Sequence, residues 1–407
     1  MSSDQIFLAL LPALLSASPL QGKKAVGEIV GLETIWSNLD NLQGRESDKA
    51  SYLDTAKAAV RTTPITRRSE MTAGRNTNIT AVMPPARDCG TQTTEPIIEE
   101  TKELRRRTCM ASNEVVDAVV PGSASNPANV KIVETLLSDK KFMEIFPVAN
   151  PAYTYNKLLK AFAKFPAICT SQNICRRTLA TLFAHFKQET GGLFYISQIN
   201  KDVNCADWSD WVVAAYPCMP GKRYFGRGAT QLQWNYNYGA FSTAMFGNAK
   251  VLLDNPEMVS DTWLNFASAL WFFVIPQPPK PSMQAVLDGS WSPNSNDRQA
   301  NRVQGFGTTT LIINGEEECG PSPPNSDGSP NRQNHYRLYA DIFKVDIRGE
   351  KLDCVDMKAF DSSGSFNPAI YWAPETACTL VNWQTAYSAL TEGNYGKCKG
   401  AEQKLSK

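Results

Sequence analysis

The sequence predicts a mainly α-helical, disulfide-stabilised fold, and three observations lead to that prediction. Several segments carry apolar residues at the i, i+3, i+4, i+7 spacing of a buried helical face, strand signals are few, and ten cysteines occur. The chain has 407 residues, enough for about two or three domains. A hydrophobic content of 42% and a charged content of 20% are typical of a globular protein.

The apolar spacing predicts individual helices along the second half of the chain. The predicted helices are Lys131–Ile145, Tyr155–Phe165, Arg177–Thr190, Thr262–Val274 and Asn334–Val345. Thr309–Ile313 is short and β-branched, so the pattern leaves strand or helix open. In the C-terminal tail, Thr379–Thr391 is the candidate for a helix.

Composition divides the chain into four parts. Residues 1–18 have a short apolar core and small residues before a cleavage point, as in a signal peptide, although the start lacks Lys or Arg and carries Asp4. Residues 19–127 are predicted to be largely low in order, with a linker before the next part. Residues 128–355 form the expected compact domain, and 356–407 a small extension with Cys and aromatic residues, for which packing is favoured over sugar binding.

The cysteines favour disulfides over metal binding. No CxxC occurs, and the two histidines are too few for ordinary zinc sites, so an oxidising, extracellular compartment is expected. Pairing of sequential neighbours is one arrangement, but spacing alone leaves the connectivity open. The ten residues are Cys89, Cys109, Cys169, Cys175, Cys205, Cys218, Cys319, Cys354, Cys378 and Cys398.

Charge and hydropathy exclude two classes of partner. The formal net charge of +1 offers no electrostatic basis for nucleic-acid binding. The N-terminal apolar run is too short to span a bilayer, so no membrane association is expected.

One carboxylate stands at the end of an apolar helix. Glu189 shares the face of Leu182 and Phe186, and Gly191 and Gly192 follow as a helix stop. Desolvation and the negative end of the helix dipole both raise the pKa of such a carboxyl, which suits a general acid. The alternative is a helix-end glutamate that points to water.

Amides and aromatic rings follow a Gly-Arg-Gly turn at 226–228. The segment Gln231-Leu-Gln-Trp-Asn-Tyr-Asn-Tyr238 lacks the spacing of a phosphate-binding loop, and an acid beside such side chains suits the cleavage of a sugar polymer. Trp234 is the better candidate for stacking on sugar, whereas Trp271 lies in an apolar helix and is expected in the core. Arg227 is expected to be structural or to pair with Glu189.

From about Asn129 to Cys354 the sequence resembles the family 19 glycoside hydrolases, which are chitinases. The motifs that carry the resemblance occur in the family's order: Gln188-Glu-Thr-Gly191, Tyr224-Phe-Gly-Arg-Gly228, Gln231-Leu-Gln-Trp-Asn-Tyr236, Leu253-Asp-Asn-Pro256, Ile312-Ile-Asn-Gly315, Glu318-Cys-Gly320 and Lys351-Leu-Asp-Cys354. The resemblance implies a two-lobed, lysozyme-like fold with a substrate cleft. It also implies inverting, endo-acting hydrolysis of chitin without a metal or cofactor, and we expect a monomer.

The resemblance assigns roles to individual residues of this chain. It implies that Glu189 is the acid, that Glu318 and Arg332 support it, and that Cys205–Cys218 and Cys319–Cys354 are disulfides. The implied sugar-binding residues are Gln231, Tyr236, Asn237 and Asn314, beside Trp234.

The chain departs from the family where a water molecule would be activated. The second carboxylate of shorter-loop members lies nine residues after the acid, and Gln198 stands there. Gln233 replaces a serine that also holds the water. A glutamine cannot take a proton at neutral pH, so activity is expected to be weak unless Asp202 or Asp207 substitutes or the loop aligns differently. The alternatives are a catalytically impaired chitin-binding protein and an enzyme that cleaves peptidoglycan.

Overall fold

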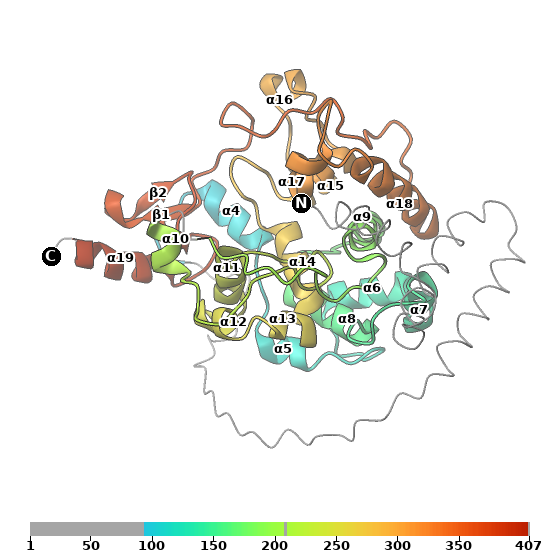
Figure 1. Ribbon diagram of the computed structural model, residues 1–407, viewed down its shortest axis with the longest axis horizontal. Coiled ribbons are helices and arrows are strands. Elements are labelled where there is room, and N and C mark those ends of the chain that lie inside the picture. Colours follow the sequence, from blue (N-terminus) through green and yellow to red (C-terminus); the bar gives the residue numbers. More distant parts are fainter. Residues whose placement is uncertain (1–92, 207–209, 406–407) are drawn as a thin grey trace, which may run out of the picture. The chain divides into compact units, whose positions relative to one another are not determined.

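The computed structural model describes residues 93–206 and 210–405, and in this part the fold is mainly α, as predicted (Figure 1). One small antiparallel sheet of order β2-β1-β3 accompanies the helices. The elements are α4 (Glu99–Arg107), α5 (Asn113–Asp117), α6 (Ala128–Leu136), α7 (Asp139–Ile145), α8 (Tyr155–Lys164), α9 (Gln172–Thr190), α10 (Asp210–Ala215), α11 (Asn235–Phe246), α12 (Lys250–Asp254), α13 (Met258–Asp261), α14 (Leu264–Val274), α15 (Met283–Asp288), α16 (Ser295–Gln299), α17 (Phe306–Glu318), α18 (Gly328–Phe343), β1 (Tyr371–Ala373), η1 (Pro374–Thr376), β2 (Thr379–Val381), β3 (Tyr387–Ser388) and α19 (Asn394–Leu405).

Helix α9 is the centre of the core. It packs most extensively against α18, and also against α6 and α15. Phe183 of α9 is fully buried and packs edge-to-face with the rings of Phe146, Tyr339 and Phe343, at centroid distances of 4.9, 5.8 and 5.6 Å. Edge-to-face pairs of this kind add to the area term of a buried aromatic, so they hold α9 firmly against α18.

Most of the predicted helices are confirmed. The structure has α8, α9, α14 and α18 where the apolar spacing predicts them, with α9 and α18 beginning five and six residues earlier. The open segment 309–313 is helical and lies within α17.

The prediction of one helix over residues 131–145 is wrong. Leu137 has an extended backbone, and Ser138 begins α7 by accepting a hydrogen bond from the Lys141 N–H. A serine at an N-cap satisfies a backbone donor that a continuous helix would have paired internally, so two shorter helices replace the long one.

The tail also differs from its predicted form. Instead of a helix over 379–391, β2 and β3 pair with β1, and the helix of the tail is α19. Ala377 and Cys378 have left-handed backbones, which end η1 and lead the chain into β2. The Cys378–Cys398 disulfide joins the start of β2 to α19.

Where little order was expected before residue 128, the described part contains α4 and α5. Arg105 of α4 donates from Nε to the Ala389 carbonyl at 2.7 Å and pairs with Glu95 at 2.7 Å. Thr101, which is buried, donates to the Ala369 carbonyl at 3.0 Å. The two carbonyl partners lie more than 260 residues away in the chain, so no local pattern could have predicted these contacts.

Within the described residues, four disulfides join sequential cysteines. They are Cys169–Cys175, Cys205–Cys218, Cys319–Cys354 and Cys378–Cys398. Cys109 is disulfide-bonded as well, and Cys89 lies outside the described residues. The prediction of a disulfide-stabilised fold is therefore confirmed.

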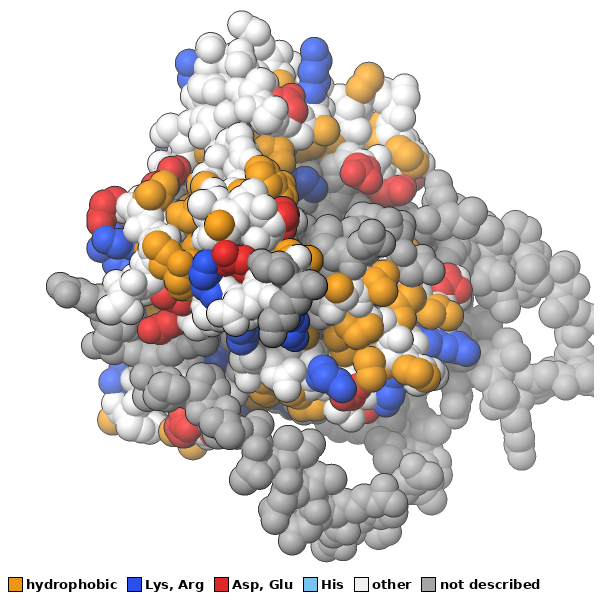
Figure 2. Space-filling model, turned by 90° about the vertical axis from the view of Figure 1, so that its left-hand side faces the viewer, with side chains coloured by type: hydrophobic (Ala, Val, Ile, Leu, Met, Phe, Trp, Pro, Cys, Tyr) orange, Lys and Arg blue, Asp and Glu red, His pale blue; other side chains and the backbone are white. Residues whose placement is uncertain are grey.

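The described surface carries charges of both signs. On the face drawn in Figure 2, blue and red side chains are interspersed with orange ones. Among the described residues, none of the helices has the length and hydropathy needed to cross a bilayer.

Arg105 offers a test of the contact between α4 and the tail. Its guanidinium also lies 5.9 Å from the centroid of the buried Trp372 ring. We expect Arg105→Ala to lower the free energy of unfolding by about 1.5–3 kcal/mol, because it leaves a buried carbonyl and Glu95 without their charged partner. Chemical denaturation measures the change.

The neighbouring Arg106 provides the control. It forms an ion pair with Glu103 on the same helix, and both side chains are more than half exposed. Arg106→Ala should change the stability by less than about 0.5 kcal/mol. Equal effects of the two substitutions would mean that α4 does not depend on the tail.

Candidate active site

The sequence of α9 places Glu189 at the helix C-terminus. Ser171 caps the start of α9, and Gly191 ends it in a left-handed conformation with φ of 62°. Leu182 and Phe186 on the same face are buried, while the Glu189 side chain keeps 18% of its surface exposed. The carboxyl is therefore partly accessible and lies directly above the core, as the spacing predicts.

A buried arginine from α18 contacts this carboxyl. Arg332 donates from Nη2 to Glu189 Oε1, and from Nε and Nη2 to the two carboxyl oxygens of Glu318 at 2.6 and 2.7 Å. The side chains of Arg332 and Glu318 are each 1% exposed. The carboxylates raise the pKa of Arg332 against the opposing effect of burial, so the guanidinium remains charged.

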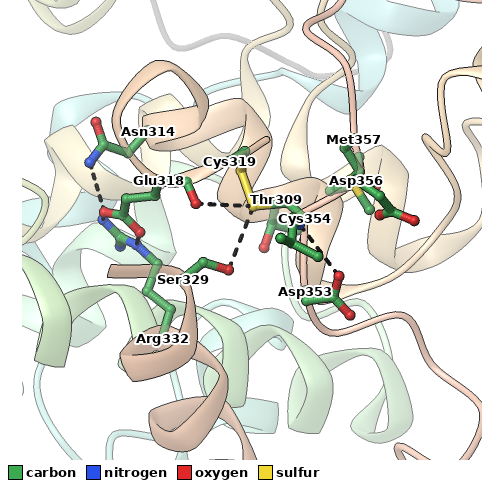
Figure 3. The surroundings of a disulfide bond; sticks show 12 residues. Thr309, Asn314, Glu318, Cys319, Ser329, Arg332, Asp353, Cys354, Asp356 and Met357 are labelled. Atoms are coloured by element: carbon green, nitrogen blue, oxygen red, sulfur yellow. Dashed lines mark hydrogen bonds and ion pairs between the residues drawn. A yellow bond between two sulfur atoms is a disulfide. The ribbon is translucent and has the colours of Figure 1, made fainter. Parts of the chain in front are cut away.

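Glu318 is held by a third group. Asn314 has a non-helical backbone that kinks α17, and its Nδ2 donates to Glu318 Oε1 at 2.7 Å. Figure 3 shows Asn314 and Arg332 on the carboxyl of Glu318, next to the Cys319–Cys354 disulfide. A side chain at Gly328 would meet the Glu318 carboxyl carbon at 2.5 Å, so only glycine fits at the start of α18.

The fourth member of the cluster, His185, was not assigned a role from the sequence. Its Nδ1 lies 3.1 Å from Arg332 Nη1, and its Nε2 lies 3.1 Å from Thr309 Oγ1. Burial, and secondarily Arg332, lowers the pKa of His185 well below its ordinary value, so the ring is neutral. The available signal was its i, i+4 spacing from Glu189, which puts both side chains on one helix face.

A second cluster surrounds the backbone of Gly226. Gln198 donates its N–H to the Gly226 carbonyl at 2.8 Å, and its Oε1 accepts the Gly226 N–H at 3.1 Å. A Cβ at Gly226 would lie 3.1 Å from Gln231 Oε1 and 3.3 Å from Gln233 Nε2. The structure therefore brings together the three glutamines that the sequence analysis singled out.

The aromatic candidates follow in the same loop. The rings of Trp234 and Tyr236 are nearly parallel, at 12° and 6.4 Å between centroids, and Trp234 is 37% exposed. Asn237 donates from Nδ2 to the Gln233 carbonyl at 2.9 Å. Gln231 and Trp234 both have positive φ, 52° and 72°, a strained backbone that often marks a functional loop.

The pKa of Tyr236 depends on burial and on a charge from α17. Burial raises the pKa of Tyr236, and the charge of Glu316, on the helix that also carries Asn314 and Glu318, adds to that rise.

The remaining candidates have partners of their own. Asp202 is exposed and accepts from Asn200 Nδ2 at 2.6 Å, and Asp207 lies outside the described residues. Arg227 is buried and donates to Tyr238 Oη at 2.8 Å and to the Arg223 carbonyl at 3.0 Å, which supports its structural role. Trp271 is in the core, as predicted.

Comparison with known proteins gives the family. The family model described as chitinase class I, which covers the family 19 glycoside hydrolases, matches residues 134–354. The chain is 38% identical over 230 residues to Endochitinase 1 of Theobroma cacao, covering 53% of this chain and 70% of that protein. With Endochitinase 1 of Gossypium hirsutum it shares 39% over 235 residues, or 53% of this chain and 69% of that protein.

A solved structure was also found. The family 19, class IV chitinase from Zea mays aligns at 30% identity with a TM-score of 0.42, covering 55% of this chain and 100% of that one. On the strength of the family match, the chain belongs to the family 19 chitinases, and its mainly α, lysozyme-like fold class is that of the family.

The histidines make the stability of this region depend on pH. Burial, with Lys187 and Arg332, lowers the pKa of His335 on α18 to about 3, against an ordinary value of 6.5. Between these values only the unfolded chain takes up the proton. The contribution of His335 is therefore complete above about pH 6.5 and falls as the pH drops, by up to about 1.4 kcal/mol per pH unit.

We expect His335→Gln to flatten the decline in unfolding free energy between pH 6.5 and pH 4, because the variant has no proton to take up at this position. Denaturant titrations across that range compare the two slopes, and His185 contributes equally to both proteins. Parallel slopes would show that His335 is not held neutral.

Proposed function

We propose that this protein binds β-1,4-linked N-acetylglucosamine polymers and hydrolyses them endo-wise with inversion, with Glu189 as the general acid. The observation that carries the proposal is the carboxyl of Glu189, partly exposed and in contact with the buried Arg332. The family match supports the same reaction class. The substrate is a chitin chain or its oligomers, and no cofactor takes part.

In the proposed reaction Glu189 donates its proton to the oxygen of the scissile glycosidic bond. The sugar then acquires oxocarbenium character, and a water molecule attacks from the opposite face. Arg332 orients the Glu189 carboxyl and offsets the negative charge left after proton transfer, while Glu318 and Asn314 hold Arg332 in place.

The side chains in the positions expected to activate the attacking water are amides. The Oε1 of Gln198 accepts the Gly226 N–H, and the Oε1 of Gln233 accepts from Asn204 Nδ2 at 3.5 Å. An amide cannot take the proton of the water, so Gln198 can at most orient it. We therefore propose slow hydrolysis, because loss of a general base typically costs about a hundredfold to ten-thousandfold in rate.

The second candidate function is chitin binding with little turnover. The two glutamines in the water-activating positions favour it, and the sugar-binding side chains do not depend on those positions. In both proposals Gln231, Trp234, Tyr236, Asn237 and Asn314 contact the substrate.

We further propose the arrangement of the whole chain. Residues 128–355 form the catalytic domain, 356–407 a packing extension, 19–127 an N-terminal region, and 1–18 a signal peptide. The disulfides fit secretion into an oxidising compartment, and a single chain carries the complete proposed site.

Hydrolysis of a soluble chitin derivative tests the catalytic proposal. We expect weak release of oligomers by the wild type, loss of that release in Glu189→Gln, and a gain of about a hundredfold or more in Gln198→Glu, because a carboxylate would then face the water. Proton NMR of the first anomer released reports inversion.

The outcomes separate the two functions. An inert wild type that Gln198→Glu activates is a chitin-binding protein that has lost its base. Undiminished activity in Glu189→Gln would remove Glu189 from the mechanism. No activity in any variant, with intact chitin-oligomer binding, would contradict hydrolysis and leave the binding function.

Trp234→Ala tests the sugar-binding face. We expect the affinity for a chitin hexamer to fall by about tenfold, because an aromatic ring contributes roughly 0.5–1.5 kcal/mol beyond its buried area. Isothermal titration with Glu189→Gln as the background avoids turnover. Trp383, in the tail and 50% exposed, is the matched control, and Trp383→Ala should leave the affinity unchanged.

A further inference from the structure

His185 is a buried polar group that the proposed reaction does not use directly. It is 1% exposed and lies on α9 one turn before Glu189. The charged groups near it come from three helices: Glu189 on α9 itself, Glu318 on α17 and Arg332 on α18. Of these, Arg332 is the one in contact with the ring, through Nη1 at 3.1 Å from Nδ1.

The hydrogen bonds determine the tautomer of the ring. A guanidinium has only donors, so the Arg332 contact requires a lone pair on His185 Nδ1. The proton of the neutral ring is then on Nε2, where it is donated to Thr309 Oγ1 at 3.1 Å. The Thr309 hydroxyl donates in turn to the Phe306 carbonyl at 2.6 Å. Every donor in this series of hydrogen bonds, from Arg332 to Phe306, therefore has an acceptor.

Packing fixes the orientation of the same ring. His185 stacks on Phe306 at 5.1 Å and 17°, and Phe306 stacks on Tyr336 at 4.2 Å and 7°. Glu350 accepts the Phe306 N–H at 2.9 Å and the Tyr336 hydroxyl at 3.2 Å. The start of α17 is thereby held against α18, and the imidazole between them cannot rotate away from Arg332.

The directions of the Arg332 donors show how His185 can fix the orientation of the guanidinium. Nε and Nη2 are directed at Glu318 and Glu189, and Nη1 lies on the other side of the planar group. A neutral acceptor at Nη1 fixes the rotation of the guanidinium without competing for its charge, whereas a protonated imidazole would place N–H against N–H.

We propose that His185 is a positioning residue, a neutral Nε2–H imidazole whose Nδ1 lone pair locks Arg332 in the orientation that contacts Glu189 and Glu318 together. Burial holds the pKa of His185 low, so the lock persists across the physiological range. The tautomer and the lock are independent of turnover, and their effect on rate rests on the proposed function.

Nitrogen-15 NMR tests the tautomer directly. The chain has only two histidines, so His335→Gln leaves His185 as the single imidazole. We expect a non-protonated Nδ1 and a protonated Nε2 whose shifts stay constant from pH 8 to pH 4. A titration near pH 6.5, or a proton on Nδ1, would overturn the proposal even in a fully active enzyme.

Substitutions test the lock. In His185→Asn the amide oxygen can take the place of Nδ1, whereas His185→Leu offers no acceptor, and Thr309→Val removes only the partner of Nε2. We expect His185→Leu to lower kcat by about 10- to 100-fold with KM changed less than about threefold, His185→Asn to retain most of kcat, and Thr309→Val to lie between them. Equal losses in His185→Leu and His185→Asn would reduce His185 to a space-filling role.

The side-chain NMR signals of Arg332 provide a readout that needs no activity. In the wild type and in His185→Asn we expect slow rotation about the Nε–Cζ bond and a sharp Nε–H signal. Fast rotation is expected in His185→Leu. If His185→Leu does not fold, Thr309→Val carries the same comparison, and an Arg332 signal unchanged in every folded variant contradicts the lock.

Discussion

The guanidinium of Arg332 pairs with two carboxylates, each at the C-terminal end of a different helix. Glu189 is the penultimate residue of α9 and Glu318 the last of α17, so each carboxyl stands at the negative end of a helix dipole. Two such groups close together in the protein interior would repel one another and lose hydration. Arg332 on a third helix meets both, and removing one partner of a buried ion pair typically costs about 3–5 kcal/mol.

The local structure around Glu318 follows from that requirement. The start of α18 approaches so closely that only glycine fits at 328, and α17 kinks at Asn314 to direct an amide at the same carboxyl. The Cys319–Cys354 disulfide then fixes the chain directly after Glu318. Because these features converge on one side chain, the acid cluster behaves as a rigid unit, which suits a group that must hold a fixed direction toward a glycosidic bond.

Sequence reasoning was most successful where the determinant was local. The helices over 155–164, 172–190 and 264–274 follow from apolar spacing, and so does the place of Glu189 at the end of one of them. The partners of Glu189 and His185 could not be found this way. Arg332 is 143 residues from Glu189, and its role was expected only from the family resemblance.

The errors arose where apolar spacing was not the deciding interaction. Residues 131–145 split because the Ser138 side chain satisfied a backbone donor that apolar spacing ignores. Helix α4 is ordered through Arg105 and its carbonyl partner 284 residues away, and the tail forms strands because β1 was there to pair with. At α4 and in the tail a contact outside the segment outweighed the local preference, whereas at Ser138 a local cap did so.

The two halves of the proposed site differ in what their side chains can do. In the cluster around Glu189, the charged groups are paired with one another through Arg332, so a substitution of one would leave another without its partner. On the opposite side, Gln198 exchanges two hydrogen bonds with Gly226, one through its backbone and one through its side-chain oxygen. A carboxylate at 198 could accept the same N–H, so the turn does not require an amide, and the glutamine keeps the turn while offering no base. Under the proposed function, the fold, the acid and the sugar-binding loop can therefore persist unchanged while a single uncharged side chain limits the rate.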